Sequence, residues 1–225
     1  MLLASARFAR VLVAGSEAAP VDLRRLLLYC FLTDPDNNRA MDTEISIVIT
    51  SRGPRIVHNH PYWHLASLNS FFYHNVRCGH GELASISCSI AADPNLENAQ
   101  TPYSMALLSD AKEAVFENVR RAKFPDRPQR LKALFVFDDR TLAERALKEW
   151  FTNEQRPPHE CRIVIESNIH KADSLWLNAS AEQFEENAAK YWQGEMTASP
   201  FPEVIVNGAL YFPDWESFPA GFPGL

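Results

Sequence analysis

The chain has 225 residues, of which 46% are hydrophobic and 22% are charged, and its formal net charge at pH 7 is −6. This length and composition suit one soluble globular domain, with or without a terminal extension. The acidic balance argues against a protein whose main ligand is a nucleic-acid backbone, since such proteins present a basic face. The basic residues between positions 120 and 130 are interpreted as a solvated helix end and loop.

Features that would mark a secreted or membrane protein are weak. The four cysteines lack C-x-x-C spacing, which argues against a disulfide scaffold and favours a reducing compartment. No window has the roughly 18 uninterrupted apolar residues of a membrane span. Arg7, Arg10 and Glu17 interrupt the apolar N-terminus, so we expect no signal peptide. The sequence therefore predicts a cytoplasmic protein, or one secreted into a host cell by a dedicated system.

The N-terminal part is weakly patterned. Residues 1–60 are predicted to form an extension of unclear role. Residues 21–31 have the spacing of a short amphipathic helix, and residues 43–50 alternate as a half-buried strand does, closed by a turn at 51–54. Residues 71–76 are predicted to be a short buried strand.

Beyond this point helices and strands alternate. Helices are predicted at residues 104–123, 141–151 and 181–192. Strands are predicted at residues 131–137, 161–166, 203–206 and 209–212. Ser104 is expected to cap the first helix, and Asp138-Asp139 is interpreted as the cap of the second. Asn207-Gly208 is the signal for a two-residue hairpin between the last two strands.

This order, with uneven connections and short C-terminal strands, predicts an α+β fold with a mixed sheet rather than a doubly wound parallel sheet. The glycine-rich fingerprints GxGxxG and GxxxxGK[ST] are both absent. Two histidine-containing groups, at residues 58–64 and 74–88, lack the spacing of regular zinc sites, so we expect no metal.

Three stretches in chain order carry a family resemblance. Tyr73-His74, at the end of the strand expected at 71–76, is similar to an aromatic–histidine motif on a first core strand. Residues 135–173 resemble the middle section of uncharacterised bacterial proteins of the same superfamily. Residues 191–208 resemble a loop and strand that deliver a catalytic glutamate. Together they resemble the His-Tyr-Glu branch of the ADP-ribosyltransferase superfamily, over about residues 71–212.

The resemblance implies an ADP-ribosyltransferase-like domain at residues 61–225, with a split, mixed β-sheet core flanked by helices. His74 matches the histidine that hydrogen-bonds the adenosine-side ribose of NAD⁺, and Tyr73 would pack beside it. Glu203 matches the catalytic glutamate that binds the nicotinamide ribose. A carboxylate at that place stabilises the oxocarbenium-like centre left by departing nicotinamide.

Two assignments stay open within the resemblance. The aromatic side chain that stacks on nicotinamide could be Tyr191, Trp192 or Tyr103. Glu195 is an alternative carboxylate to Glu203.

The implied function is a mono-ADP-ribosyltransferase that cleaves NAD⁺ and transfers ADP-ribose to a macromolecular acceptor. The acidic composition favours a protein acceptor slightly over nucleic acid, and a bacterial toxin or effector, with an antitoxin or host partner, is the implied setting. No metal or membrane is needed. The alternatives are an NAD⁺ glycohydrolase with the same site and a non-catalytic interaction protein that retains the fold.

Overall fold

The structure is a computed structural model that describes residues 45–68, 71–107 and 110–220. The helix expected at residues 21–31 lies outside these residues. The strands are β1 (Ile45–Thr50), β2 (Gly53–His58), β3 (Tyr62–Leu65), β4 (Glu82–Ala84), β5 (Leu134–Val136), β6 (Pro158–Ile163), β7 (Asn168–Asp173), β8 (Pro202–Asn207) and β9 (Ala209–Tyr211). The α-helices are α2 (Phe72–Cys78), α3 (Ile86–Ala92), α4 (Pro102–Leu107), α5 (Ala111–Lys123), α6 (Arg140–Trp150) and α7 (Phe184–Gln193). Short 3₁₀ turns lie at Pro94–Leu96, Arg130–Lys132, Ser174–Leu177, Ala181–Gln183 and Trp215–Ser217.

The strands form three antiparallel groups. β1 pairs with β2, a four-stranded sheet has the order β3-β6-β9-β4, and a three-stranded sheet has the order β5-β8-β7. A bridge between Trp63 and Phe137 connects the two larger sheets. The α+β prediction is confirmed, but every strand pairing in the described ranges is antiparallel, so a mixed sheet was the wrong expectation.

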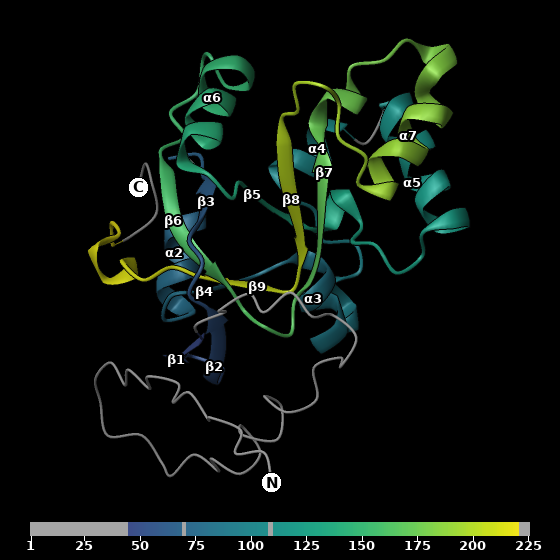
Figure 1. The fold of residues 1–225 in the computed structure, drawn as a ribbon. Coiled ribbons are helices and arrows are strands. Elements are labelled where there is room, and N and C mark those ends of the chain that lie inside the picture. The colour runs from purple at the N-terminus through teal and green to yellow at the C-terminus, as the bar shows by residue number, and fades with distance from the viewer. Residues whose placement is uncertain (1–44, 69–70, 108–109, 221–225) are drawn as a thin grey trace, which may run out of the picture.

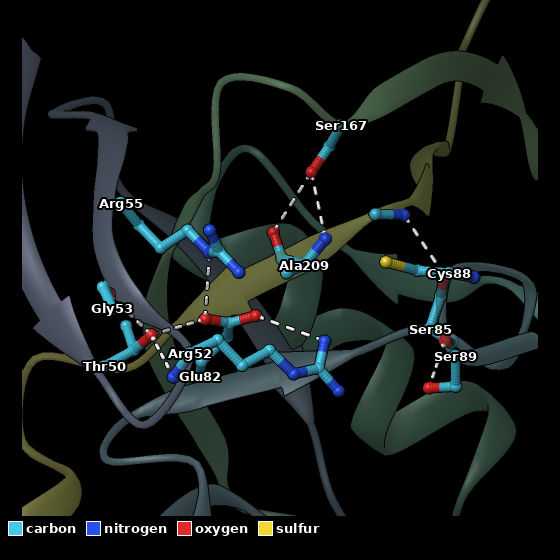
Figure 2. A network of polar contacts seen from close by, with 11 residues as sticks. Thr50, Arg52, Gly53, Arg55, Glu82, Ser85, Cys88, Ser89, Ser167 and Ala209 are labelled. Carbon is cyan, nitrogen blue, oxygen red and sulfur yellow. Dashed lines mark hydrogen bonds and ion pairs between the residues drawn. The ribbon is translucent and has the colours of Figure 1, made fainter. Parts of the chain in front are cut away.

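Asn207-Gly208 is a corner rather than a hairpin turn. β8 pairs with β5 and β7, whereas β9 pairs with β4 and β6, so the two strands on either side of the corner belong to different sheets. Ser85 donates its backbone N–H to the Gly208 carbonyl at 2.8 Å and accepts the Gly208 N–H on its hydroxyl at 3.1 Å. Ser167 binds the next residue, Ala209, through both backbone groups (Figure 2). The hairpin prediction was therefore wrong, because these contacts send the chain into a second sheet.

Alternation along β8 gives the three-stranded sheet two different faces. Val204 and Val206 point into a core cluster with Val136 of β5 and with Tyr73 and Val76 of α2. Ile205 points the other way, into a cluster built mainly from α5 and α7. Figure 1 shows α5 and α7 beside β7, and α2 beside β3 and β6. The sheet thus separates α2 from α5 and α7.

Two helical segments differ from the sequence prediction. Residues 71–76 were expected to be a strand, but Phe71 is the N-cap of α2 and residues 72–76 lie within this helix, which buries Phe72, Tyr73 and Val76 on one side. A short apolar run cannot distinguish a buried strand from a buried helix turn, which explains the error. The long helix expected at 104–123 is two helices, α4 and α5. Asp110, whose side chain accepts from Lys112 N–H, caps α5 in place of Ser104.

The β1–β2 hairpin is joined to the rest of the described chain. Val57 of β2 forms a bridge with Val164, and Ile165 donates its N–H to the Ile56 carbonyl at 2.9 Å. Val57, Val164 and Ala209 share a small apolar cluster. Residues 45–58, which the sequence assigned to the N-terminal extension, therefore pack against β6 and β9.

The corner at Gly208 predicts a specific sensitivity to added volume. Its φ is +157°, and a Cβ at this position would lie 2.1 Å from the Ser167 Oγ. We expect Gly208→Ala to lower the free energy of unfolding by about 2–4 kcal/mol, because the Ser167 segment must move.

Gly53→Ala is the matched control. Gly53 has a φ of +95° but no atom within 4 Å of the added Cβ, so only backbone strain of about 1 kcal/mol is expected. Urea unfolding curves of both variants measure the difference. Equal losses would contradict the close packing described at Gly208.

Candidate functional site

Glu203, the carboxylate that the resemblance assigns to catalysis, lies inside a buried polar network. Its Oε1 accepts hydrogen bonds from Arg130 Nη1 and from the Tyr191 hydroxyl, each at 2.6 Å. The same arginine donates from Nε to the Glu113 carboxylate, at 3.2 Å to Oε2. Glu113, Arg130 and Glu203 are each only 4% exposed. Arg130 therefore joins α5, α7 and β8 beneath the surface.

Aromatic rings enclose this network. The Arg130 guanidinium carbon lies 5.3 Å from the Phe135 ring centroid and 5.1 Å from the Tyr191 centroid, within the range of cation–π contacts. Such an environment makes a charge costly unless it is paired and hydrogen-bonded, and the pairing here meets that condition. In the described structure Glu203 thus has a structural role, since it links β8 to Arg130 and to Tyr191 of α7.

The other residues named for the nicotinamide side are also engaged. Trp192 is fully buried and donates its indole N–H to the Phe116 carbonyl at 2.8 Å. Tyr191 is fully buried within the Arg130 network. Glu195 is exposed in the loop after α7, and its carbonyl accepts from the Trp176 indole. Tyr103 lies in α4, and its side chain is outside what the structure describes. Neither Tyr191 nor Trp192 presents a ring face to solvent.

His74 and Tyr73 lie on α2 rather than on a core strand. Tyr73 is buried in the cluster that contains Val204 and Val206. His74 follows it on the helix, and its Nε2 is 3.5 Å from the Cys78 sulfur. Because Glu203 points to the opposite face of β8 from Val204, the three-stranded sheet stands between Tyr73 and the Glu203 carboxylate. The structure does not bring the expected pair together.

A histidine pair that the sequence analysis passed over lies on the α2 side of the sheet. His64 of β3 and His159 of β6 are directly opposite each other in the antiparallel register. The ring of Phe72, from α2, lies against both imidazoles, with centroid distances of 5.5 Å to His64 and 5.2 Å to His159. The Tyr73 hydroxyl is 3.1 Å from His159 Nε2. Two imidazoles, a phenol and a phenyl ring thus converge from three elements.

His64 has the strand context that the sequence analysis expected for His74. Trp63-His64 is an aromatic–histidine pair on a strand of the core, whereas Tyr73-His74 is on a helix. The signal was present in the sequence, since residues 62–65 (Tyr-Trp-His-Leu) are bulky enough for a strand. It was hidden because Pro61 and the neighbouring histidines made residues 58–64 look irregular.

The tautomer of His64 follows from its backbone contact. His64 Nδ1 is 2.8 Å from the Phe135 carbonyl oxygen, and a carbonyl can only accept, so Nδ1 carries the proton. Burial lowers the pKa of His64, which outweighs the opposing effect of the Phe135 hydrogen bond. The ring is therefore neutral near pH 7, with a lone pair on Nε2.

Asp138 brings a carboxylate to the same face of the sheet. Its neighbour Asp139 caps α6 by accepting from Thr141 N–H, as expected, but Asp138 forms an ion pair with Lys171 instead. The Trp63–Phe137 bridge places Asp138 beside Tyr62, whose pKa is raised by burial and further by the Asp138 charge. Lys171 is opposite Val204 in the β7–β8 ladder. Residues opposite each other in an antiparallel ladder share a face, so Lys171 and its ion-pair partner Asp138 lie on the Val204 face. His64 is two residues after Tyr62 in β3 and therefore lies on this face as well.

Neither of two surface hollows includes the pair expected from the sequence. One, of about 320 Å³, is lined mainly by α2, β4 and the β1–β2 turn, and the other, of about 600 Å³, by α6 and the segment before β6. Neither lining contains Glu203 or His74. Within the described ranges, no three histidine, cysteine or acidic side chains are grouped to hold a metal ion. No helix of these ranges is long and apolar enough to cross a membrane.

Comparison with known proteins places the chain in a family without assigning an activity. The chain belongs to the family described as "Protein of unknown function (DUF2441)", whose model matches residues 82–213, more than half of its length. Among curated proteins, none gives a significant match. The matched segment contains Asp138, the Arg130 network and His159, and it begins after β3 and His64.

The Arg130 network predicts a large stability effect. We expect Arg130→Met to lower the free energy of unfolding by about 3–5 kcal/mol, because it leaves two buried carboxylates without their counter-charge. Arg140→Met is the control, since it removes an exposed i,i+4 pair with Glu144 and should cost less than about 1 kcal/mol. Chemical unfolding measures both. A loss at Arg130 no larger than at Arg140 would contradict the network.

The histidine pair predicts an acid-sensitive contribution to stability. Burial, together with a smaller effect of the neighbouring His64, lowers the pKa of His159 from 6.5 to about 4. Between these two pH values the unfolded chain binds a proton that the folded chain does not, so stability is present above about pH 6.5 and is lost as the pH falls towards 4. The imidazole is partly exposed, so the slope should be below about 1.4 kcal/mol per pH unit.

His159→Gln should flatten this part of the stability profile. His60→Gln is the control, because His60 is exposed and its removal should leave the slope unchanged. Thermal or urea unfolding between pH 4 and pH 7 measures the slope. A wild-type profile that does not fall in this window, or one unaffected by His159→Gln, would contradict the buried neutral state.

Proposed function

We propose that this chain is an NAD⁺-using ADP-ribosyltransferase that cleaves NAD⁺ and transfers ADP-ribose to a macromolecular acceptor, with protein favoured over nucleic acid. The proposal starts from the resemblance over residues 71–212, with His64 in place of the Tyr73-His74 part, and is supported by an α+β fold whose β8 and β9 enter different sheets. The observation that carries it is His64, an aromatic-flanked histidine on a core strand with a neutral ring. A bacterial toxin or effector, opposed by an antitoxin or directed at a host protein, fits such an activity.

His64 would bind the dinucleotide through its Nε2 lone pair, which can accept a hydrogen bond from a ribose hydroxyl. The backbone bond to Phe135 fixes the ring tautomer, and Phe72 packs on the ring and limits its rotation. The site would therefore be organised before NAD⁺ arrives, which lowers the entropic cost of binding.

Asp138 is the carboxylate that the proposal places at this face. In the reaction the bond between the nicotinamide nitrogen and the ribose C1′ breaks, nicotinamide leaves, and the acceptor nucleophile binds C1′ and loses its proton. A carboxylate near C1′ stabilises the developing positive charge. Asp138 is partly exposed and forms an ion pair with Lys171, whereas Glu203 is buried and accepts hydrogen bonds from Arg130 and Tyr191. Glu203 remains the residue assigned by the resemblance, and the two carboxylates can be compared directly.

The second candidate is a non-catalytic interaction protein. It is favoured by the burial of Glu203, Tyr191 and Trp192, which are the residues of the C-terminal resemblance. An NAD⁺ glycohydrolase is a variant of the first proposal in which water replaces the acceptor. It would release nicotinamide without added acceptor and label no macromolecule.

The test is NAD⁺ cleavage by purified protein with and without cell lysate, measured as released nicotinamide and as labelled macromolecules. Each variant has a matched control. His64→Gln is compared with His74→Gln, and Asp138→Asn with Asp139→Asn. We expect His64→Gln and Asp138→Asn to lower cleavage about 100-fold, by loss of ribose binding and of charge stabilisation, while both controls stay within about threefold of wild type.

Glu203→Gln completes the comparison. Paired with Glu113→Gln, it perturbs the same Arg130 network, so equal effects of the two variants indicate a structural role. If Glu203→Gln loses NAD⁺ cleavage while Glu113→Gln and Asp138→Asn keep it, Glu203 is the catalytic carboxylate. That result would contradict the assignment of this role to Asp138. Folded wild-type protein that neither binds nor cleaves NAD⁺ would support the interaction protein instead.

A further inference from the structure

Another pocket lies away from the histidine pair, at the opposite end of α2. It has a volume of about 320 Å³ and is built from the β1–β2 turn, the end of α2, β4 and α3. Its polar lining includes Ser51, Arg52, Asn75, Cys78 and Ser89. Neither the resemblance nor the proposed function uses any of these residues.

The charge of this pocket is set by two arginines that share one carboxylate. Arg52 Nη1 is 3.4 Å and Arg55 Nε is 3.2 Å from the carboxylate of Glu82, as Figure 2 shows. Glu82 also accepts from the Thr50 hydroxyl at 2.7 Å. Two guanidinium groups and one carboxylate leave one positive charge. Because the Arg52 side chain is 45% exposed and its contact is long, much of that charge faces the pocket.

The thiol of Cys78 lines the same pocket. Cys78 is exposed, whereas Cys161 is buried, and burial raises the pKa of the Cys161 thiol. The Cys78 sulfur lies 3.5 Å from His74 Nε2, one helical turn earlier. An imidazole at this distance can accept the thiol proton, and the thiolate is the nucleophilic form.

The backbone holds the thiol and the guanidinium together. Ser51 donates its N–H to the Gly79 carbonyl at 3.1 Å, which ties the β1–β2 turn to the residue after Cys78. A Cβ at Gly79 would lie 2.0 Å from the Glu82 carbonyl, so this close approach needs a glycine. Arg52 and Cys78 are thus fixed on two sides of one pocket.

We propose that this pocket is a thiol-modification site, in which Cys78 reacts with anionic thiol-reactive compounds that Arg52 draws in. The chemical class is a small disulfide that carries carboxylates. Cys78 loses its proton to His74, and the sulfur attacks one sulfur of the disulfide, whose S–S bond breaks. A mixed disulfide forms on Cys78, and the other half leaves as a thiolate that takes up the proton.

The test uses two alkylating probes of similar size, iodoacetate, which is anionic, and iodoacetamide, which is neutral. Rates are measured on the folded full chain for each cysteine separately, by mass spectrometry of its peptide. Cys88, which is partly buried in α3, serves as the internal reference. We expect the ratio of the iodoacetate rate to the iodoacetamide rate to be about tenfold higher at Cys78 than at Cys88.

Three variants separate the contributions. Arg52→Ala should remove the preference for iodoacetate and change the iodoacetamide rate less than about twofold. Arg55→Ala also removes one positive charge beside Glu82, but it leaves Arg52 in the pocket lining, so it should lower the preference less than Arg52→Ala does. His74→Gln should slow both probes about equally. Melting curves show that each variant is folded.

Glutathione disulfide then tests the proposed class of compound. Wild-type protein should form the mixed disulfide at Cys78 faster than at Cys88, and Arg52→Ala should lose that advantage. A probe ratio at Cys78 no higher than at Cys88, or one unchanged by Arg52→Ala, would overturn the proposal. The result is independent of NAD⁺ cleavage, which these variants should leave unaltered.

Discussion

The described core depends on the placement of one arginine among buried carboxylates. Arg130, in the short turn before β5, binds Glu113 of α5 and Glu203 of β8, and Tyr191 of α7 completes the set. Removal of the arginine would leave two carboxylates without water or counter-charge, which is far more costly than the loss of a surface pair. The network therefore fixes how α5 and α7 lie on the three-stranded sheet. It also explains why Glu203, which the sequence analysis expected to be catalytic, is part of the core.

The alternation along β8 then determines which residues can act together. Glu203 and Ile205 point towards α5 and α7, whereas Val204 and Val206 point towards α2. His64, Asp138 and Lys171 lie on the Val204 face, so a nucleotide bound by His64 would meet Asp138 before it met Glu203. The proposed NAD⁺ site uses this face. The Arg52–Cys78 pocket lies at the other end of α2 and involves a different set of charges.

The sequence was a good guide to local structure and a poor guide to contacts across the sheet. The strand β1, the helix α6 with its Asp139 cap and the helix α7 follow from periodicity and capping chemistry. Residues 71–76 were assigned wrongly because a short apolar run fits either a helix or a strand. Asn207-Gly208 has the composition of a hairpin, but Ser85 and Ser167 make it a corner, and both lie far away in the sequence. The burial of Glu203 could not be predicted, since Arg130 is 73 residues earlier.

The central claim is that NAD⁺ binds on the His64 face of the sheet. Each face of the sheet carries a histidine whose NMR signals would change if NAD⁺ bound beside it. His170 lies on the Glu203 face, where its Nε2 contacts the Tyr191 carbonyl and its ring stacks on Trp192. NMR of ¹⁵N-histidine-labelled protein, titrated with NAD⁺ and assigned with His64→Gln and His170→Gln, follows both imidazoles at once. The account predicts a shift of the His64 Nε2 signal with the His170 signals unchanged. A shift at His170 without one at His64 would contradict it.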